Sequence, residues 1–149
     1  MKHRILIYAI ACTLAAGILL ALFALQPSVG PEGKAPVYGI ALDGSAKAYL
    51  KAAVARSGII NDAVGSQRVL LVWNQSTQSA MAFDRIVNGN LLTFEKIPSG
   101  IRDNTGNEWG LDGTGRTSGS RGLRLARIPV NEQSWASWKA QYPGSALAR

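Results

Sequence analysis

Histidine and cysteine are almost absent from this chain of 149 residues. His3 and Cys12 are the only two, and both lie near the N-terminus. Residues 13–149 therefore cannot form a disulfide, and they offer no thiol nucleophile, imidazole base or thiolate ligand. This excludes a Ser-His-Asp triad and nearly all transition-metal sites, and leaves only the oxygen ligands that suit calcium or magnesium. We expect this part of the chain to fold without a metal or another cofactor.

Acidic residues are also scarce, with 9 Asp and Glu against 16 Lys and Arg, and the formal net charge is +7. Only Lys2 and Arg4 precede Pro27, so the rest of the chain carries 14 basic against all 9 acidic residues, a net charge of +5. This excess favours an anionic lipid surface or polymer as a partner. Because the same part is predicted to be exported, we expect it to bind no nucleic acid.

One long apolar run is present, and it begins close to the N-terminus. Residues 5–25 contain no charge and follow the basic residues Lys2 and Arg4. As a helix the run spans roughly 32 Å, close to the hydrocarbon thickness of a bilayer. It predicts an anchor over residues 1–26 in the inner (plasma) membrane, with the N-terminus cytoplasmic and the rest periplasmic or extracellular. The alternatives are a cleaved signal that releases the protein to the periplasm and, less favoured, lipoprotein cleavage at Cys12.

The proline and glycine residues of 27–36 predict a linker, and residues 37–149 are enough for one domain with a single core. Asp43-Gly44 and Asn88-Gly89 are typical of hairpin turns, and Val69–Trp73 is typical of a buried strand. The fold class expected is mainly β (α+β): one small antiparallel β-rich domain with a C-terminal helix, preceded by the transmembrane helix.

Two helices are expected among the strands. Lys51–Arg56 is interpreted as a short helix, and Asn131 as the cap of a second helix over Glu132–Gln141. Between the strands and this second helix, residues 100–122 are rich in glycine and predict turns that join short strands. Residues 123–128 alternate in polarity like a half-exposed strand.

Short blocks follow one another along nearly all of residues 37–149: Val37-Tyr38-Gly39-Ile40, Gly44-Ser45-Ala46-Lys47-Ala48-Tyr49, Ile59-Ile60-Asn61-Asp62, Ala82-Phe83-Asp84-Arg85, Leu91-Leu92-Thr93-Phe94-Glu95, Asp103-Asn104-Thr105-Gly106-Asn107-Glu108-Trp109, Trp135-Ala136-Ser137-Trp138 and Tyr142-Pro143-Gly144. Their order resembles the bacterial domain of unknown function 3179 family. The resemblance implies an exported or membrane-attached domain with no assigned activity.

The chain departs from that family at two positions. In many relatives a Cys-Pro-x-Cys-Gly stretch follows the strand aligned with Val69–Trp73, where this chain has Asn74–Gln78. A histidine often precedes the Ile-x-Asn-Asp block, where this chain has Ser57. If the family uses these cysteines and histidine for metal or redox chemistry, this member has lost the atoms that would perform it.

Carboxylates are the remaining candidates for catalysis, because hydrolysis of a glycosidic bond needs only two carboxyl groups at a fixed separation. The candidates are Asp62, Asp84, Asp103 and Glu108, with Asp112 nearby in sequence. The alternative is that these side chains cap turns and form ion pairs, and we interpret Asp84-Arg85 as a cross-strand charge contact.

Four arginines lie close together in the sequence with no acidic residue among them: Arg116, Arg121, Arg124 and Arg127. Guanidinium groups bind phosphate and carboxylate, so an anionic ligand such as a lipid headgroup or a cell-wall polymer is one interpretation. A solvated strand face that prevents edge pairing is the other. Trp109, Trp135 and Trp138 could stack on sugar rings, or they could belong to the core.

The function predicted from these features is a non-catalytic binding or assembly module of the cell envelope, attached to the membrane by its N-terminal helix. An enzyme that uses carboxylates on an envelope glycan or similar polymer is the alternative. The sequence does not identify a protein partner.

Overall fold

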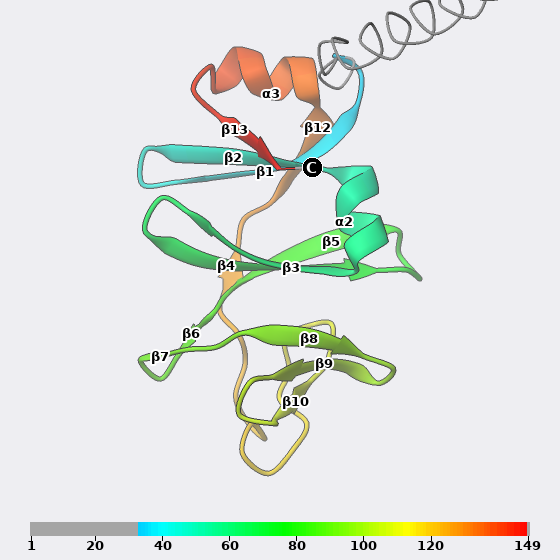
Figure 1. Cartoon of the computed structure of the whole chain (residues 1–149), viewed down its shortest axis with the longest axis vertical. Coiled ribbons are helices and arrows are strands. Elements are labelled where there is room, and N and C mark those ends of the chain that lie inside the picture. The colour runs from blue at the N-terminus through cyan, green and yellow to red at the C-terminus, as the bar shows by residue number, and fades with distance from the viewer. Residues whose placement is uncertain (1–32, 149) are drawn as a thin grey trace, which may run out of the picture. The chain divides into compact units, whose positions relative to one another are not determined.

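The structure, a computed structural model, describes residues 33–148. The predicted anchor over residues 1–26, with any cleavage site in it, and most of the predicted linker lie outside this range. Among residues 33–148, none of the helices has the length and apolar character needed to cross a bilayer. Three of the four sheets in this part are stacked in layers, which we call the upper, middle and lower sheets after their places in Figure 1. A helix covers the outer face of the upper sheet (Figure 1).

The upper sheet combines strands from both ends of the described domain. Its strand order is β12-β1-β2-β13, in which only the β13–β2 pair is parallel. The strands are β1 (Pro36–Leu42), β2 (Ser45–Leu50), β12 (Asn131–Ser134) and β13 (Ala146–Ala148). Asp43 and Gly44 join β1 to β2 with positive φ angles of 47° and 79°, as the Asp-Gly signal predicts.

Helix α3 (Trp135–Gln141) lies on the outer face of the upper sheet. Its Trp138 is fully buried against Val37 and Ala48. The ring lies directly over Gly39, where an added Cβ would come within 2.1 Å of it. Only glycine at this position of β1 leaves room for the indole.

The middle sheet has the strand order β11-β5-β4-β3. Its strands are β3 (Ile59–Val64), β4 (Gln67–Asn74), β5 (Ser79–Asp84) and β11 (Arg127–Ile128). Side chains alternate along β4, so that Val69 and Leu71 enter the core shared with the upper sheet, and Leu70 and Val72 enter the core shared with the lower sheet. Burial on both faces explains the uninterrupted apolar run in this strand.

The lower sheet, of order β10-β9-β8, is the smallest layer of the stack. It consists of β8 (Phe94–Ile97), β9 (Gly100–Asp103) and β10 (Glu108–Trp109). A two-stranded hairpin precedes it, made of β6 (Ile86–Val87) and β7 (Asn90–Leu91). Asn88 and Gly89 form its turn with φ angles of 50° and 79°, which confirms the predicted hairpin.

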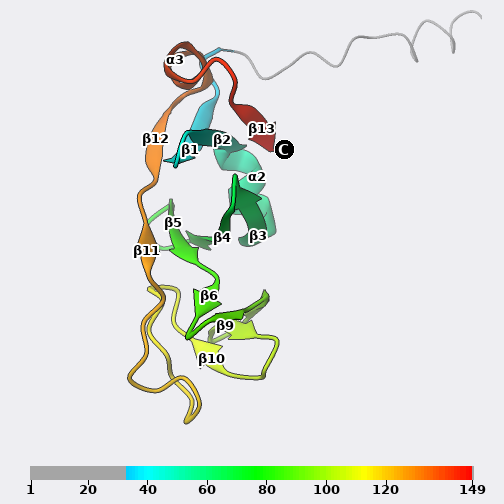
Figure 2. The same cartoon turned by 90° about the vertical axis from the view of Figure 1, so that its left-hand side faces the viewer.

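Two connections tie the middle and upper sheets together. Helix α2 (Lys51–Ser57) leads from β2 to β3 and buries Val54 in the core between the sheets. On another side, β11 and β12 form one extended run that leaves the middle sheet after Ile128 and joins the upper sheet at Asn131 (Figure 2).

The β-rich class, the mainly antiparallel pairing and the short helix α2 are confirmed. The predicted start of the C-terminal helix is wrong, because residues 131–134 pair with β1 as strand β12 and Ser134, not Asn131, caps α3. The predicted strand over residues 123–128 is reduced to β11. Strand β13, which follows α3, was not expected.

Candidate functional site

The glycine-rich segment forms a folded loop against the lower sheet and the edge of the middle sheet. We call residues 110–126 the arginine loop. Its two arms pair across backbone contacts, with the Gly115 amide donating to Leu123 at 3.0 Å and the Leu125 amide donating to Gly113 at 2.9 Å. Gly113 has a φ of 81°, and a Cβ there would meet the Phe83 ring at 2.7 Å. Glycine is therefore required where the loop crosses the core.

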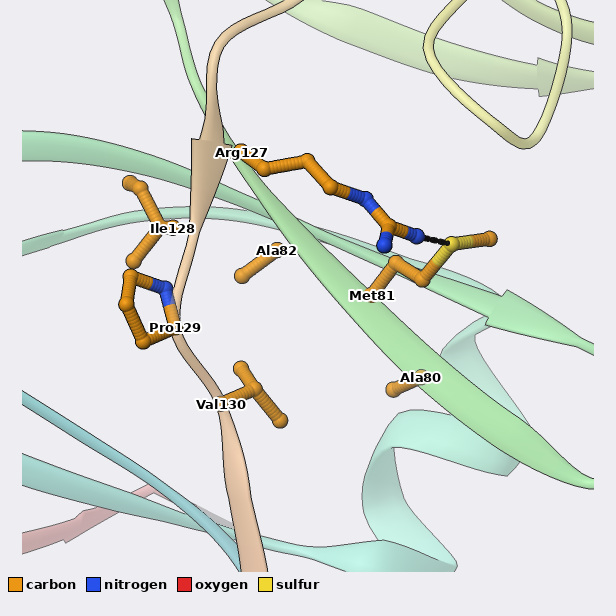
Figure 3. Close-up of a pocket in the computed structure, with 7 residues that line it drawn as sticks. All are labelled: Ala80, Met81, Ala82, Arg127, Ile128, Pro129 and Val130. Atoms are coloured by element: carbon orange, nitrogen blue, oxygen red, sulfur yellow. Dashed lines mark hydrogen bonds between the residues drawn. The ribbon is translucent and has the colours of Figure 1, made fainter.

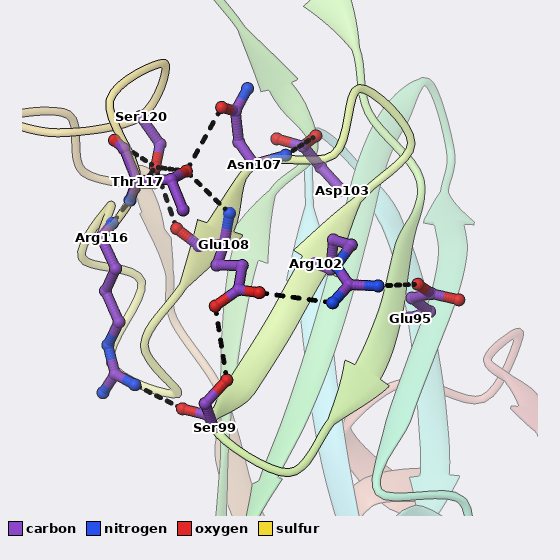
Figure 4. A network of polar contacts seen from close by, with 9 residues as sticks. All are labelled: Glu95, Ser99, Arg102, Asp103, Asn107, Glu108, Arg116, Thr117 and Ser120. Atoms are coloured by element: carbon purple, nitrogen blue, oxygen red, sulfur yellow. Dashed lines mark hydrogen bonds and ion pairs between the residues drawn. The ribbon is translucent and has the colours of Figure 1, made fainter.

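Ser120 fastens the tip of the arginine loop to strand β10 (Figure 4). Its hydroxyl is fully buried, donates to the Glu108 carbonyl at 2.9 Å and accepts from the Arg116 amide at 3.1 Å. Thr117 adds a second tie, since its Oγ1 accepts from the Glu108 amide at 3.0 Å. Buried polar groups with several partners hold one geometry, so the loop is a fixed platform rather than a free chain.

Charged side chains continue this network across the lower sheet (Figure 4). Arg102 lies between Glu95 and Glu108, at 3.4 and 3.3 Å. Glu108 also accepts from the Ser99 hydroxyl, and Arg116 donates through Nη1 to the Ser99 carbonyl. These groups are partly exposed, so the ion pairs contribute little to stability. They nevertheless give the Glu108 carboxylate partners within the protein itself.

The structure gives the four candidate arginines different surroundings. Arg116 folds back over the loop, where its guanidinium lies close to Gly100 and Gly110. Arg121 and Arg124 are exposed on the arginine loop, and Arg127 projects from β11. Within residues 33–148, none of the four forms an ion pair with a carboxylate.

Asp112 lies within the arginine loop, and its carboxylate is held mainly by Thr114. Hydrogen bonds from the Thr114 amide at 3.1 Å and its hydroxyl at 2.9 Å lower the pKa of Asp112, and Arg124 contributes a smaller lowering. Asp112 therefore acts as a turn cap within the arginine loop.

Trp109 is a core residue. Its side chain is 1% exposed and packs edge-to-face on Phe94, with ring centroids 6.3 Å apart. Its Nε1 donates to Asp103 at 2.8 Å. Burial leaves no ring face on which a sugar could stack. The position of Trp109 therefore supports a role in the core rather than in sugar binding. Trp138 is likewise buried, and Trp135 is half-buried beside it.

Asp103 is a buried carboxylate that neutral donors satisfy. Besides Trp109, it accepts hydrogen bonds from the Thr105 amide at 2.8 Å and the Thr105 hydroxyl at 2.6 Å, and from the Asn107 amide at 3.1 Å. Burial alone would raise the pKa of Asp103, but these bonds outweigh it and hold the pKa below its usual value. An ionised carboxylate with this many donors is suited to fixing the β9–β10 turn.

The other two candidate carboxylates lie in the middle sheet. Asp62 on β3 and Asp84 on β5 both align with Val69, so they share one face of the sheet two strands apart. Asp62 forms an ion pair with Lys47 at 2.6 Å and accepts from the Tyr49 hydroxyl at 3.0 Å. Burial would raise the pKa of Asp62, and Lys47, the Ala63 amide and Tyr49 together lower it. Asp84 caps the amide of Ile86 at 2.8 Å.

These placements divide the predicted catalytic candidates into two groups on different sheets. Asp62 and Asp84 lie in the middle sheet, and Asp103 and Glu108 lie in the lower sheet. Residues 33–148 contain no cluster of three or more acidic, histidine or cysteine side chains that could hold a metal ion.

Arg85 forms a junction that the sequence did not predict. It is 9% exposed and donates to the Asn61 side chain at 3.4 Å and to the Leu92 carbonyl at 3.3 Å. Asn61 in turn accepts from the Phe94 amide at 2.9 Å and donates to its carbonyl at 2.7 Å. The cross-strand charge contact expected at Asp84-Arg85 is wrong, because within the described residues neither side chain forms an ion pair and Arg85 has only neutral acceptors.

The junction explains three of the sequence blocks on which the family resemblance depends. The blocks Ile59–Asp62, Ala82–Arg85 and Leu91–Glu95 meet at this point, where the middle sheet is joined to the start of β8. Their order in the sequence was the available signal, although it does not reveal that they are in contact.

A comparison with protein-family models gives one family. The model described as protein of unknown function (DUF3179) matches residues 22–145. The chain belongs to this family. Comparisons of this family member with curated proteins and with solved structures give no significant match. The family description assigns no activity, so the function has to be argued from the site itself.

Proposed function

We propose that this protein is a non-catalytic binding module of the cell envelope, held at the membrane by residues 1–26, and that its arginine loop binds an anionic envelope component. The observation that carries the proposal is the exposure of Arg121 and Arg124 on a loop whose backbone is fixed by buried hydrogen bonds. Guanidinium groups on a preorganised platform bind phosphate or carboxylate without the entropy cost of ordering the loop.

The position of the arginine loop suits a partner that lies away from the point where the domain is attached to the proposed membrane anchor. The first described residue, Gly33, accepts a hydrogen bond from the Ala136 amide of α3, on the outer face of the upper sheet. The arginine loop lies at the other end of the stack, beside the lower sheet (Figure 1). Since stacked sheets lie about 10 Å apart, a domain tethered through residue 33 can present this loop some 20 Å or more from its attachment.

The competing hypothesis is an enzyme that uses carboxylates on an envelope glycan. Such an enzyme needs two carboxyl groups free to approach one bond of the substrate. Asp62, Asp103 and Glu108 are each held by several partners within the fold, and Asp84 caps a backbone amide. These contacts favour structural roles for the acidic residues, and therefore the binding module.

The experiment is retention of the full-length protein on a heparin column at increasing salt. Replacing both Arg121 and Arg124 with glutamine should make the protein elute at lower salt, because screening shortens the Debye length from about 10 Å at 0.1 M to about 3 Å at 1 M. Lys34→Gln with Arg56→Gln removes two exposed positive charges from other parts of the domain and serves as the matched control.

Stability separates the two interpretations of the arginines. The double arginine variant should unfold within about 0.5 kcal/mol of the wild type, as is usual for exposed substitutions. Unchanged retention in a folded variant, or a loss equal to that of the control, would contradict the proposal. A marked fall in stability would show that the arginines are structural.

A further inference from the structure

A small cleft lies between the β6–β7 hairpin and the arginine loop. Its volume is about 150 Å³. The hairpin contributes Val87, Asn88 and Asn90 to the lining, and the arginine loop contributes Gly119 and Leu123. The cleft therefore adjoins the loop for which anion binding is proposed above.

The hairpin turns its more polar face toward the cleft. Val87 and Asn90 pair across the two strands, so their side chains share one face, and both residues line the cleft. Ile86 and Leu91 form the neighbouring pair, which belongs to the opposite face, and they are 46% and 50% exposed. The amide of Asn90 is thus on the side of the hairpin that meets the arginine loop.

Hydrogen bonds hold both walls of the cleft. The Leu92 amide donates to the Arg85 carbonyl at 2.8 Å, and Arg85 Nη1 donates to the Leu92 carbonyl at 3.3 Å, which closes the base of the hairpin. On the other side, Asn107 accepts from Thr117 Oγ1 at 3.3 Å, and a Cβ added to Gly119 would come within 2.3 Å of Asn107 Oδ1. Two fixed walls keep the cleft in shape without a ligand, which lowers the cost of binding.

The available polar groups of the lining are neutral. Within residues 33–148 the Asn88 side chain has no hydrogen bond, Asn90 uses only Nδ2, and Asn107 uses one of its two Nδ2 protons. The carboxylate of Asp103 also borders the cleft, but its oxygens already accept four hydrogen bonds. Amide donors and acceptors beside apolar side chains suit a ring with hydroxyl groups on its rim and C–H groups on its faces.

Three of the four arginines already have contacts within the domain. Arg116 donates to a backbone carbonyl of the β8–β9 turn. Arg127 contacts the sulfur of Met81 through Nη2 (Figure 3). The positive charge of Arg124 contributes to the lowered pKa of Asp112. Among the described residues, the side chain of the fourth arginine has no hydrogen bond or ion pair.

Arg121 is this fourth arginine, and its backbone lies beside the cleft. It is midway in sequence between Gly119 and Leu123, which both line the cleft. Two residues of chain span at most about 7 Å, a distance that an arginine side chain can cover. The Arg121 amide donates to the Thr117 carbonyl at 2.6 Å, which fixes the backbone while the side chain stays exposed.

We propose that the cleft binds one sugar ring of an acidic polysaccharide and that Arg121 binds a carboxylate of the same segment. This assignment rests on the anion binding proposed above and names the class of ligand. The carboxylate pairs with the guanidinium fork. The ring lies against Val87 and Leu123, and its hydroxyl groups bond to the asparagine amides.

The size and position of the cleft support this ligand. Sites for a whole small molecule usually measure about 300 to 1,000 Å³, so a cleft of about 150 Å³ suits a single ring of a longer chain. The neutral lining suits the uncharged part of the ligand, and Arg121 suits its anionic part. The position of the arginine loop, away from the point of attachment, favours a polymer over a lipid surface.

Trp109 provides a reporter at the cleft. It is too buried to stack on a sugar, but it belongs to the lining and its Nε1 donates to Asp103. The chain has 4 tryptophans, so isotope labelling of the indole nitrogens gives four NMR signals to assign. Titration of the full-length protein with tetragalacturonate should move the Trp109 signal and saturate.

Two further probes separate the rings from the charge. Maltotetraose has sugar rings without carboxylates and should bind about tenfold more weakly, because it lacks the charge-assisted hydrogen bonds to Arg121. Polyacrylate has carboxylates without rings, and it should bind the protein without moving the Trp109 signal.

Variants locate the two halves of the site. Arg121→Gln should weaken tetragalacturonate binding about tenfold and leave the weaker maltotetraose binding unchanged. Asn90→Ala should weaken both sugars about fivefold, the usual effect of one neutral hydrogen bond, and leave polyacrylate binding unchanged. Asn131→Ala removes an exposed asparagine of β12 outside the cleft and is the matched control, which should alter none of these affinities.

The outcomes distinguish this assignment from the function on which it rests. Equal binding of tetragalacturonate and polyacrylate, with no movement of the Trp109 signal, would overturn the assignment and keep a general anion site. Failure of both polyanions to bind would overturn both proposals. A saturating Trp109 shift with phosphatidylglycerol vesicles but not with tetragalacturonate would identify a lipid headgroup instead. If Asn90→Ala does not fold, Asn90→Phe decides, since unchanged tetragalacturonate binding with the cleft filled would exclude it.

Discussion

Asp103 shows how a single residue can be both buried and charged. Neutral donors from Thr105, Asn107 and Trp109 surround its carboxylate, and their combined effect lowers its pKa despite burial. A carboxylate whose pKa is lower in the folded than in the unfolded state stabilises the fold above its unfolded pKa. That contribution is lost as the pH falls through the folded pKa.

We predict that Asp103→Asn destabilises the domain by about 2 kcal/mol at pH 7, because the amide group brings its own donor against N–H groups that need an acceptor. In acid, below the pKa of the folded Asp103, the wild-type carboxyl is protonated too and the difference should shrink. Urea unfolding at pH 7 and at an acidic pH below that pKa measures both quantities.

The matched control is Asp43→Asn in the β1–β2 turn. Asp43 is exposed and has a φ of 47°, a conformation that asparagine also tolerates. Its substitution should change stability little at either pH. An Asp103→Asn penalty that is the same at both pH values would contradict the ionised assignment.

At the scale of an element, the start of helix α3 depends on a choice between two caps. Asn131 and Ser134 are both good N-cap residues, and the sequence alone favoured the first. In the structure Asn131 pairs with Gly39 of β1, and the Ser134 hydroxyl accepts from the Ser137 amide at 3.2 Å. Strand pairing of residues 131–134 takes the predicted cap and the first three predicted helical residues away from the helix.

We predict that Ser134→Ala costs about 1 kcal/mol of stability, the usual value for a lost helix cap. Asn131→Ala should cost less than about 0.5 kcal/mol, because the side chain is exposed on β12 and its backbone pairing is kept. Thermal unfolding of both variants is the measurement. A larger effect at Asn131 would place the start of the helix three residues earlier.

At the scale of the whole molecule, local signals predicted local structure. The Asp43-Gly44 and Asn88-Gly89 turns and the buried run of β4 depend on neighbouring residues and were found in place. The β12–β1 and β13–β2 pairs join residues far apart in the sequence, and no local pattern specifies them.

The candidate site shows the same division. Composition identified the arginines and the acidic residues, but their different surroundings follow from tertiary contacts. Arg116 lies against glycines and Arg127 over Phe83, while Arg121 and Arg124 face solvent. The role of the buried Arg85 was predicted wrongly, because its partners are backbone carbonyls and an asparagine rather than an acid.

The proposed attachment to the membrane is also a property of the whole molecule. We predict that alkaline phosphatase fused after Arg149 is active, because the enzyme needs disulfides that form outside the cytoplasm. The purified protein should retain Met1 to Leu25 on N-terminal sequencing. A product that begins near Leu25 or Gln26 would instead identify a cleaved signal.

The composition of the upper sheet has a consequence for the order of folding. Strands β1 and β2 come from the beginning of the domain, and β12 and β13 come from its end. During synthesis the sheet cannot be completed until the last residues have emerged, and closing so long a loop makes folding slow. A domain whose first sheet stays open until β13 has been made can still pass unfolded through a membrane channel, which would suit the export proposed above.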